Sequence, residues 1–255
     1  QEYAQADDRF EVIHLAENSG QAHARNCGLQ RARGEVVCML DADDWLSDNA
    51  LEQLYGAFDA ETDCVLFDLV NVGDDGREEH YPMEPFDVLT GEEAFSRSLT
   101  WQIHGLYGVR SDIHRSHPYD ETCHSYSDDN TTRLHYYKSR EVRCCEGVFY
   151  YRICPVSITH QPTLRRFDWM RANESMKRHL EKLGVEERIM RKWETRRMMI
   201  LVDCCCFYHC HRRKFKPADR HDAVGELHRV WNSIDRSLLD PAKTRKFGYR
   251  PMSCW

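Results

Sequence analysis

A continuous apolar segment constrains the fold of this chain more than any other feature. Residues 35–40 read Glu-Val-Val-Cys-Met-Leu, and residues 64–67 form a second apolar run. A strand with one face in water alternates apolar and polar side chains, whereas a strand covered on both faces in a parallel sheet is apolar throughout. Both segments are therefore predicted to be buried strands. Residues 10–15 alternate, and they are predicted to form a further strand.

Helical patterns separate these segments. Small and apolar residues recur at helical spacing from Gly20 to Ala32, and Gly34 follows as a stop signal. A second helix is predicted over residues 48–58. Strands that alternate with helices in this way predict an α/β sheet with right-handed crossovers.

The middle of the chain is less regular. Residues 71–125 are predicted to be rich in loops, with a short helix over residues 92–99. A longer helix is predicted over residues 128–140, followed by a pair of strands around residues 142–144 and 148–152. We expect these elements to complete the sheet domain.

The pattern changes after Pro162. Apolar residues then recur at spacings of three and four, as in helices that bury a single face. Three amphipathic helices that pack as a cap on the sheet are predicted. Residues 1–162 are thus expected to form a sheet domain, and residues 163–255 a C-terminal helical extension.

Charge is divided unevenly along the chain. Within the formal net charge of −7, residues 1–132 contain 8 Lys and Arg against 28 Asp and Glu, whereas residues 133–255 contain 27 against 14. An acidic front half suits cation binding and repels nucleic acid, and a basic rear half suits phosphates, anionic lipid or the front half itself. Mutual neutralisation within one fold is the alternative explanation.

Neither a membrane span nor a disulfide framework is predicted. The longest apolar runs, residues 36–40 and 198–202, fall far short of the roughly 18–20 residues that a spanning helix needs. The twelve cysteines lack the Cys-x-x-Cys pairs of zinc sites. We interpret them as reduced, which predicts a cytoplasmic protein.

Three carboxylates follow the first buried strand. Asp41, Asp43 and Asp44 lie at its carboxyl end, where ligands collect in open α/β sheets. Carboxylates this close repel one another unless a cation lies between them. Oxygen ligands suit Mg²⁺ or Mn²⁺, with a shell that substrate phosphates complete. Asp41 and Asp43 are therefore predicted metal ligands, while Asp44 is interpreted as a helix N-cap, which is the structural alternative for all three.

A candidate anion site lies upstream. A helix that begins near Gly20 presents N–H groups to an anion, and Arg25 and Asn26 supply further donors. Together with the acidic segment, the stretch GQAHARNCGLQRARGEVVCMLDADDWL resembles the donor-binding stretch of the family 2 glycosyltransferases, which have the GT-A fold. That family shows Ala-Arg-Asn-x-Gly, then Ala-x-Gly-Glu, then Asp-x-Asp-Asp. All three landmarks are present, at residues 24–28, 32–35 and 41–44.

The resemblance covers roughly residues 1–162 and implies a fold and a set of roles. The fold would be a Rossmann-like α/β architecture, with a mixed, mostly parallel sheet and helices on both faces. Arg25, Asn26 and Asp41 would bind the donor. Asp41 and Asp43 would hold Mg²⁺ or Mn²⁺, the cofactor that the resemblance implies.

Two later segments extend the resemblance. Asp128 and Asp129 resemble the family's Glu-Asp or Asp-Asp pair at the start of a helix, where the second carboxylate is the general base, so Asp129 inherits that role. Asp128 stands where Glu is commoner, and an acidic N-cap is the alternative for the pair. Tyr150-Tyr151-Arg152 ends a segment similar to Tyr-x-Tyr-Arg, so Arg152 is predicted to clamp a diphosphate. His160 is interpreted as an ordinary loop residue.

Two parts of the family pattern are not found. These are an opening Val-x-Val-Ile-Ile-Pro-x-Tyr-Asn strand and a second strand that ends in the Asp residues holding the nucleotide base. One βαβ unit of about 30 residues would supply both. The chain is therefore expected to be an N-terminally truncated transferase.

The resemblance implies a cytoplasmic, metal-dependent transferase, with the inner face of the membrane as a possible place of action. It would move a sugar from a nucleotide-sugar, first of all a UDP-sugar, to a hydroxyl of a glycan or lipid-linked saccharide in polysaccharide biosynthesis. Inversion of the anomeric configuration is what the family resemblance implies. The basic helices after Pro162 would rest on anionic lipid, or else serve only in packing. Nucleic acid is not an expected partner.

Three alternatives stay open at this point. A phosphatase of the haloacid-dehalogenase type also ends an apolar strand in Asp-x-Asp, although Trp45 and the Ala-Arg-Asn-x-Gly stretch do not fit it. A nucleotidyltransferase shares the sheet and the metal site. A non-catalytic remnant would bind a partner through its basic helices and turn over no nucleotide.

Overall fold

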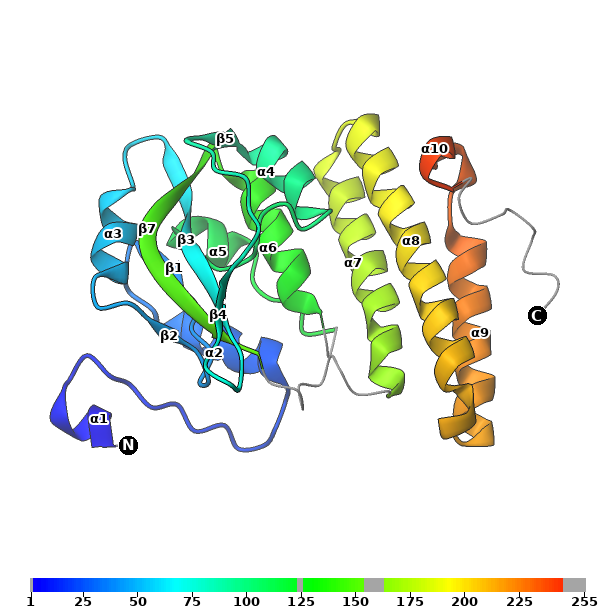
Figure 1. Ribbon diagram of the computed structural model, residues 1–255, viewed down its shortest axis with the longest axis horizontal. Coiled ribbons are helices and arrows are strands. Elements are labelled where there is room, and N and C mark those ends of the chain that lie inside the picture. Colours follow the sequence, from blue (N-terminus) through cyan, green and yellow to red (C-terminus); the bar gives the residue numbers. More distant parts are fainter. Residues whose placement is uncertain (1, 123–125, 154–162, 245–255) are drawn as a thin grey trace.

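The structure is a computed structural model that describes residues 2–122, 126–153 and 163–244. A curved sheet flanked by helices is followed by a row of long helices at one side of the sheet domain (Figure 1). The strands are β1 (Val36–Cys38), β2 (Trp45–Leu46), β3 (Thr62–Val72), β4 (Glu78–His80), β5 (Leu89–Thr90), β6 (Tyr107–Arg110) and β7 (Glu141–Arg152). The helices of the sheet domain are α1 (Glu2–Ala6), α2 (Gln21–Arg31), α3 (Ala50–Gly56), α4 (Gly91–Ser98), α5 (Ser111–Ser116) and α6 (Ser127–Lys138).

Strand β3 forms the centre of the sheet and is buried on both faces, as its apolar run predicts. The strand order is β1-β6-β3-β7-β2, with β4 paired to β3 and β5 paired to β7. Successive side chains of a strand point to opposite faces. Cys64 and Leu66 accordingly lie in one apolar cluster with α4 and α6, while Val65 and Phe67 lie in another with α3. Helices therefore cover both faces, and the mixed α/β fold is confirmed.

The expectation of mostly parallel pairs is wrong. In the described part of the chain β3 and β7 pair in parallel, and all the other pairings are antiparallel. Strands β1 and β3 do point the same way, because each is antiparallel to β6, which lies between them. The crossover through α3 connects β1 to β3 and leaves space for one strand between them. Strand β6, which comes later in the sequence than both, occupies this space. Sequence pattern alone does not reveal such an insertion.

Two strand predictions also fail. The predicted pair around residues 142–152 is the single strand β7, in which a bulge takes the place of a turn, since the register shifts between the Leu66 and Asp68 pairings. Residues 10–15 alternate in polarity as a strand does, but they form no strand and expose Phe10, Val12 and Ile13. No strand among the described residues lies beside them, and an extended segment without a neighbour has no ladder to stabilise it.

The helical extension matches the sequence pattern. It consists of α7 (Asp168–Leu183), α8 (Glu187–His211), α9 (Pro217–Ser233) and the short α10 (Pro241–Thr244). Phe95 and Leu134 of the sheet domain pack with Met176, Leu180 and Trp193 of α7 and α8, so the two parts share one apolar cluster. In the part of the chain that the structure describes, none of the helices combines the length and apolar composition needed to cross a membrane.

Candidate functional site

The acidic segment after β1 forms a tight turn. The Asp44 N–H donates to the Asp41 carbonyl at 3.1 Å, so residues 41–44 reverse the chain before β2 begins. Strand β2 then pairs with β7, and Trp45 stacks on Tyr150 with ring centroids 5.2 Å apart. The turn is thereby held at the carboxyl end of β1, as the sequence predicts.

Arg25 joins this turn to helix α6. Its Nη2 donates to both Asp41 carboxylate oxygens, at 2.8 and 3.0 Å, and its Nη1 lies 3.4 Å from Asp128 Oδ2. The side chain of Arg25 is only 14% exposed, and its guanidinium lies over the Tyr119 ring at 5.2 Å. Burial lowers the pKa of Arg25, but the hydrogen bond to Asp41 and the nearby negative charges outweigh it, so the net shift is upward. Three predicted site residues from three separate elements therefore meet as one charged cluster.

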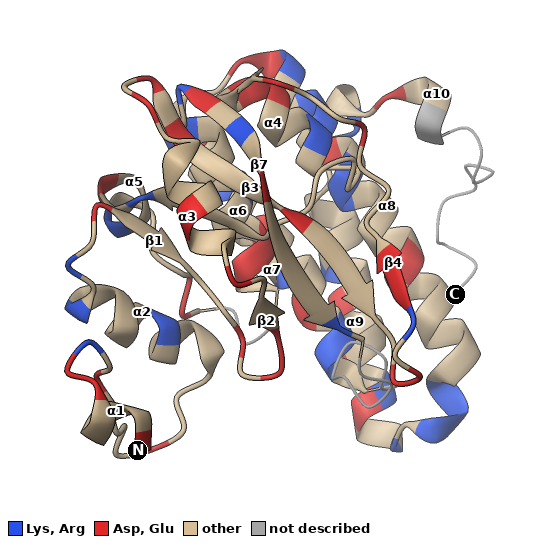
Figure 2. Ribbon diagram, turned by 60° about the vertical axis from the view of Figure 1, so that its left-hand side comes forward, with Lys and Arg blue, Asp and Glu red and all other residues tan. Residues whose placement is uncertain are grey.

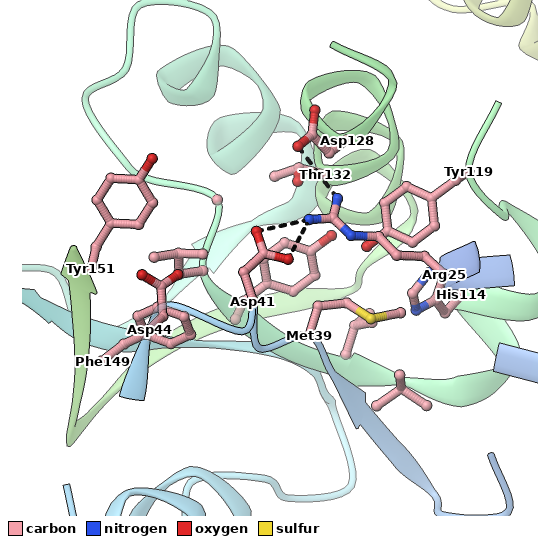
Figure 3. A pocket seen from close by; sticks show the side chains of 15 residues that line it. Arg25, Met39, Asp41, Asp44, His114, Tyr119, Asp128, Thr132, Phe149 and Tyr151 are labelled. Carbon is pink, nitrogen blue, oxygen red and sulfur yellow. Dashed lines mark hydrogen bonds and ion pairs between the residues drawn. The ribbon is translucent and has the colours of Figure 1, made fainter. Parts of the chain in front are cut away.

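A cavity of about 170 Å³ opens beside this cluster. Arg25, Asp41, Asp44 and Asp128 lie along it together with aromatic and apolar side chains, as Figure 3 shows. The further lining residues are Val37, Met39, Gly105, Leu106, Tyr107, Val109, His114, Tyr119, Thr132, Phe149 and Tyr151. An apolar cavity with a few convergent charged groups is the usual form of a small-molecule site.

Asn26 has a different environment from its neighbour Arg25. Its side-chain amide donates to the Tyr119 carbonyl at 2.9 Å and to Glu121 Oε1 at 2.7 Å, and its carbonyl oxygen accepts from the Tyr119 N–H at 3.0 Å. The residue is 8% exposed and does not line the cavity. In this arrangement Asn26 holds the segment that carries Tyr119, which in turn supports Arg25.

The two adjacent aspartates of α6 face different surroundings. Consecutive helical residues point about 100° apart. Asp128 lines the cavity and meets Arg25, whereas Asp129 is not among the lining residues and its Oδ2 lies 3.8 Å from Nη1 of the buried Arg133. Burial raises the pKa of Asp129 to about 6, Arg133 opposes the shift, and the Asp128 charge adds to it.

Arg152 lies at the acidic turn rather than over the cavity. Its Nε donates to the Asp43 carbonyl at 3.1 Å, and its backbone N–H donates to Asp44 Oδ1 at 2.9 Å. The guanidinium also lies 5.4 Å from the centroid of the Trp45 ring. Arg152 is exposed, so its guanidinium is open to a ligand at this edge of the turn. His160 lies outside the described residues.

The acidic turn fits a hard divalent cation through its donor chemistry. Burial raises the pKa of Asp44, and the Asp43 and Asp41 carboxylates raise it further, so negative charge is concentrated at this point. Carboxylate oxygens are ligands that Mg²⁺ and Mn²⁺ accept. Among the residues the structure describes, however, no three His, Cys, Asp or Glu side chains are arranged as a metal site. Asp41 is paired with Arg25, which leaves Asp43 exposed for a cation that a substrate would help to hold.

Several lining residues were not predicted from the sequence. Tyr119, His114 and Thr132 come from the irregular middle of the chain and from α6, and no periodic pattern distinguishes them. Tyr119 follows Pro118 in a turn-rich stretch, which marks a loop but not its place in the fold. The positions of His114 and Tyr119 depend on strand β6, which directly precedes α5, whereas helix α6 places Thr132.

Comparison with known proteins shows which family the N-terminal part of the chain resembles. The sequence model of "Glycosyl transferase family 2" matches residues 1–117. A stretch of 66 residues is 44% identical to EpsH of Bacillus subtilis, named as a glycosyltransferase, and covers 26% of this chain and 19% of EpsH. Over 177 residues the chain is 28% identical to the glycosyltransferase EpsJ of the same organism, covering 64% of this chain and 50% of EpsJ. The similarity to glycosyl transferase family 2 therefore lies in residues 1–117, a little under half of the chain.

Solved structures agree on the fold. The TarS 1–349 crystal structure from S. aureus, in complex with UDP, superposes with a TM-score of 0.64 at 18% identity, covering 90% of this chain and 66% of that one. At this identity the likeness concerns architecture, which is the GT-A fold. The matched segments span between about a fifth and a half of the two B. subtilis relatives. These similarities favour a glycosyltransferase over the phosphatase and nucleotidyltransferase alternatives, and a non-catalytic relative of the family stays as the alternative to an enzyme.

Proposed function

We propose that the protein transfers a sugar from a UDP-sugar to a hydroxyl of a glycan or lipid-linked saccharide. The observation that carries the proposal is the cluster in which Arg25 joins Asp41 to Asp128 beside the cavity. The cluster combines the Arg25 guanidinium, which can bind a diphosphate, with carboxylates that can bind a metal ion and sugar hydroxyls. The family match over residues 1–117 supports sugar transfer, and TarS, which shares the fold, was crystallised with UDP and with UDP-GlcNAc.

Each residue of the cluster has a proposed part. Arg25 and Arg152 orient the donor diphosphate, because a planar guanidinium binds phosphate oxygens in pairs. Asp41 and Asp43 hold Mg²⁺ or Mn²⁺, which would offset the charge that develops on the leaving diphosphate. Asn26 positions the Tyr119 segment beneath Arg25. This is a supporting part rather than a direct contact with the donor.

Asp129 is proposed as the general base. A carboxylate with a pKa of about 6 is ionised at neutral pH and still accepts a proton more readily than an ordinary aspartate. Asp128, which faces Arg25, would fix the start of α6 against the donor site. Direct displacement by the activated hydroxyl would invert the anomeric configuration. A product with retained configuration, read from its anomeric NMR coupling, would contradict this step.

The first experiment is a calorimetric titration of UDP into the protein at its natural length, with and without Mn²⁺. We expect metal-dependent binding that falls about tenfold or more in Asp41→Asn, since a charge-assisted bond to Arg25 and a metal ligand are both weakened. Asp48→Asn, which alters an exposed carboxylate just after β2, is the matched control and should bind as the wild type does. Equal affinity of both variants would remove Asp41 from the donor site. Donor binding without any turnover would favour the non-catalytic alternative.

The turn between α8 and α9 supports a second, separable proposal of membrane contact. Arg212, Arg213, Lys214 and Lys216 gather there, and the blue segments of Figure 2 mark them at one end of the extension. A cluster of this kind attracts anionic lipid at about 1 kcal/mol per basic residue. We propose that it rests on the cytoplasmic face of a membrane, where lipid-linked acceptors lie. Sedimentation with vesicles should show binding only when anionic lipid is included, and binding that ignores lipid charge would end the proposal.

A further inference from the structure

Helix α2 carries a second group of polar side chains beside the donor site, in which neither Cys27 nor His23 has a part in the roles proposed above. Cys27 follows His23 by one helical turn, and its Sγ lies 3.5 Å from His23 Nε2. The other ring nitrogen, His23 Nδ1, lies 2.8 Å from Glu121 Oε2. Cysteine, imidazole and carboxylate are therefore aligned in the order of a nucleophile, its base and the group that orients the base.

The hydrogen-bond partners fix the state of the imidazole. Hydrogen bonds from Asn26 and from His23 lower the pKa of Glu121, so its carboxylate is ionised and can only accept. The proton of His23 is then held on Nδ1, which donates to Glu121. Nε2 is left as an acceptor that faces the thiol. A proton that leaves Cys27 passes to Nε2, and Glu121 stabilises the imidazolium that results.

The thiol is within reach of small molecules. The side chains of His23 and Glu121 are 37% and 47% exposed, and Cys27 is half-buried. Reactive cysteines occupy partly exposed positions beside a group that favours the thiolate, whereas buried cysteines such as Cys64 and Cys204 are inert. Cys210 on α8 is exposed and offers an internal reference.

We propose that Cys27 is an activated thiol and a site of covalent modification by low-molecular-weight disulfides. The Cys27 thiolate attacks one sulfur of the disulfide, a new S–S bond forms as the old one breaks, and the released thiolate takes the proton held on His23. One thiol and one disulfide are consumed and one disulfide and one thiol are formed, so no further oxidant is needed. An ordinary thiol is only a few per cent ionised at neutral pH. Transfer of the proton to His23, which Glu121 stabilises, can therefore increase the rate of attack on the disulfide by roughly tenfold.

Modification at this point would reach the donor site. Glu121 is shared between His23 and Asn26, Asn26 holds both backbone groups of Tyr119, and the Tyr119 ring supports Arg25. A group attached to Cys27 Sγ competes for space with the imidazole, whose Nε2 lies 3.5 Å away, and would disturb the contact of His23 with Glu121. This link between the thiol and the donor site rests on the proposed function, since it predicts that the modified protein binds UDP more weakly.

The test uses dithiodipyridine, an uncharged disulfide, so that the acidic surface does not bias its approach. Labelled sites are mapped by mass spectrometry after short exposures. We expect Cys27 to react about tenfold faster than Cys210 at neutral pH. His23→Gln and Glu121→Gln should reduce that ratio to near one, while the exposed controls His14→Gln and Glu52→Gln should leave it unchanged. Equal rates at both cysteines in the wild type, or a ratio that survives His23→Gln, would overturn the proposal.

Two further measurements separate the possible failures. The ratio of the labelling rates at Cys27 and Cys210 in the wild type needs no variant to fold, and a ratio near one counts against the activated thiol. UDP affinity should fall after labelling, return with dithiothreitol, and stay constant in labelled Cys27→Ser. Fast labelling with unchanged UDP affinity would overturn the coupling to the donor site. Fast labelling of a protein that binds no UDP even when reduced would leave the reactive thiol standing and count against the proposed function alone.

Discussion

Replacing Asp129 by asparagine should stabilise the protein while it abolishes the reaction. The carboxylate has a pKa of about 6 in the folded protein against an ordinary value of 3.8, and burial is the main cause. Each pKa unit corresponds to about 1.4 kcal/mol, so ionised Asp129 costs roughly 3 kcal/mol of folding free energy at pH 7. Asparagine has nearly the same shape without the charge. Asp129→Asn is therefore expected to gain up to about 3 kcal/mol at neutral pH.

The pH dependence of this gain follows from linkage. Between pH 3.8 and about 6 the folded state binds a proton that the unfolded state has lost, so stability falls as pH rises through this window. The advantage of Asp129→Asn should accordingly be largest above pH 6 and fall below about 1 kcal/mol at pH 4. Urea unfolding of both proteins at pH 4 and pH 7 measures it. Turnover should drop about 10²- to 10⁴-fold in the variant, as expected when a general base is lost.

Asp128→Asn is the control for this prediction. Its carboxylate is 46% exposed and meets Arg25, so no comparable stability gain is expected. A variant Asp129→Asn that is no more stable than the wild type at pH 7 would refute the reasoning that burial destabilises this charge. A variant that is more stable yet fully active would retain that reasoning and exclude Asp129 as the base.

The remaining predictions concern stability. Asn26→Ala leaves both backbone groups of Tyr119 without their partners in a buried place, and should cost about 2–4 kcal/mol by urea unfolding; a loss below 1 kcal/mol would mean that water replaces the amide. Gly147→Ala would place a Cβ 2.7 Å from the Ala50 carbonyl oxygen and should destabilise by about 1–3 kcal/mol. Gly225→Ala, in the exposed face of α9 with no atom within 4 Å, should instead stabilise by about 0.5–1 kcal/mol. The free energy of unfolding should therefore change in opposite directions in the two glycine variants, and changes in the same direction would contradict this reasoning.

The sequence by itself determined the elements whose cause is local. The apolar run before Asp41 predicted a strand, which β1 forms, and residues 41–44 form the expected turn at its end. Its expected burial is wrong for most of the run, because only Val37 of β1 is buried and Leu40 is exposed. Apolar spacings of three and four predicted α7, α8 and α9, because a helix buries one face whatever its neighbours are. Landmarks around Arg25 and Asp41 indicated the family, and these two residues do meet.

Tertiary structure decided everything that depends on partners distant in the chain. Strand β6 inserts between β1 and β3, antiparallel to both, and no local pattern specifies which strand fills that gap. Residues 10–15 have the alternation of a strand but no neighbour, and a strand exists only as part of a ladder. Asp128 and Asp129 are indistinguishable as a sequence pair. The packing of α6 between the sheet and α7 turns the first toward Arg25 and the second toward Arg133, and burial then gives only the second a raised pKa.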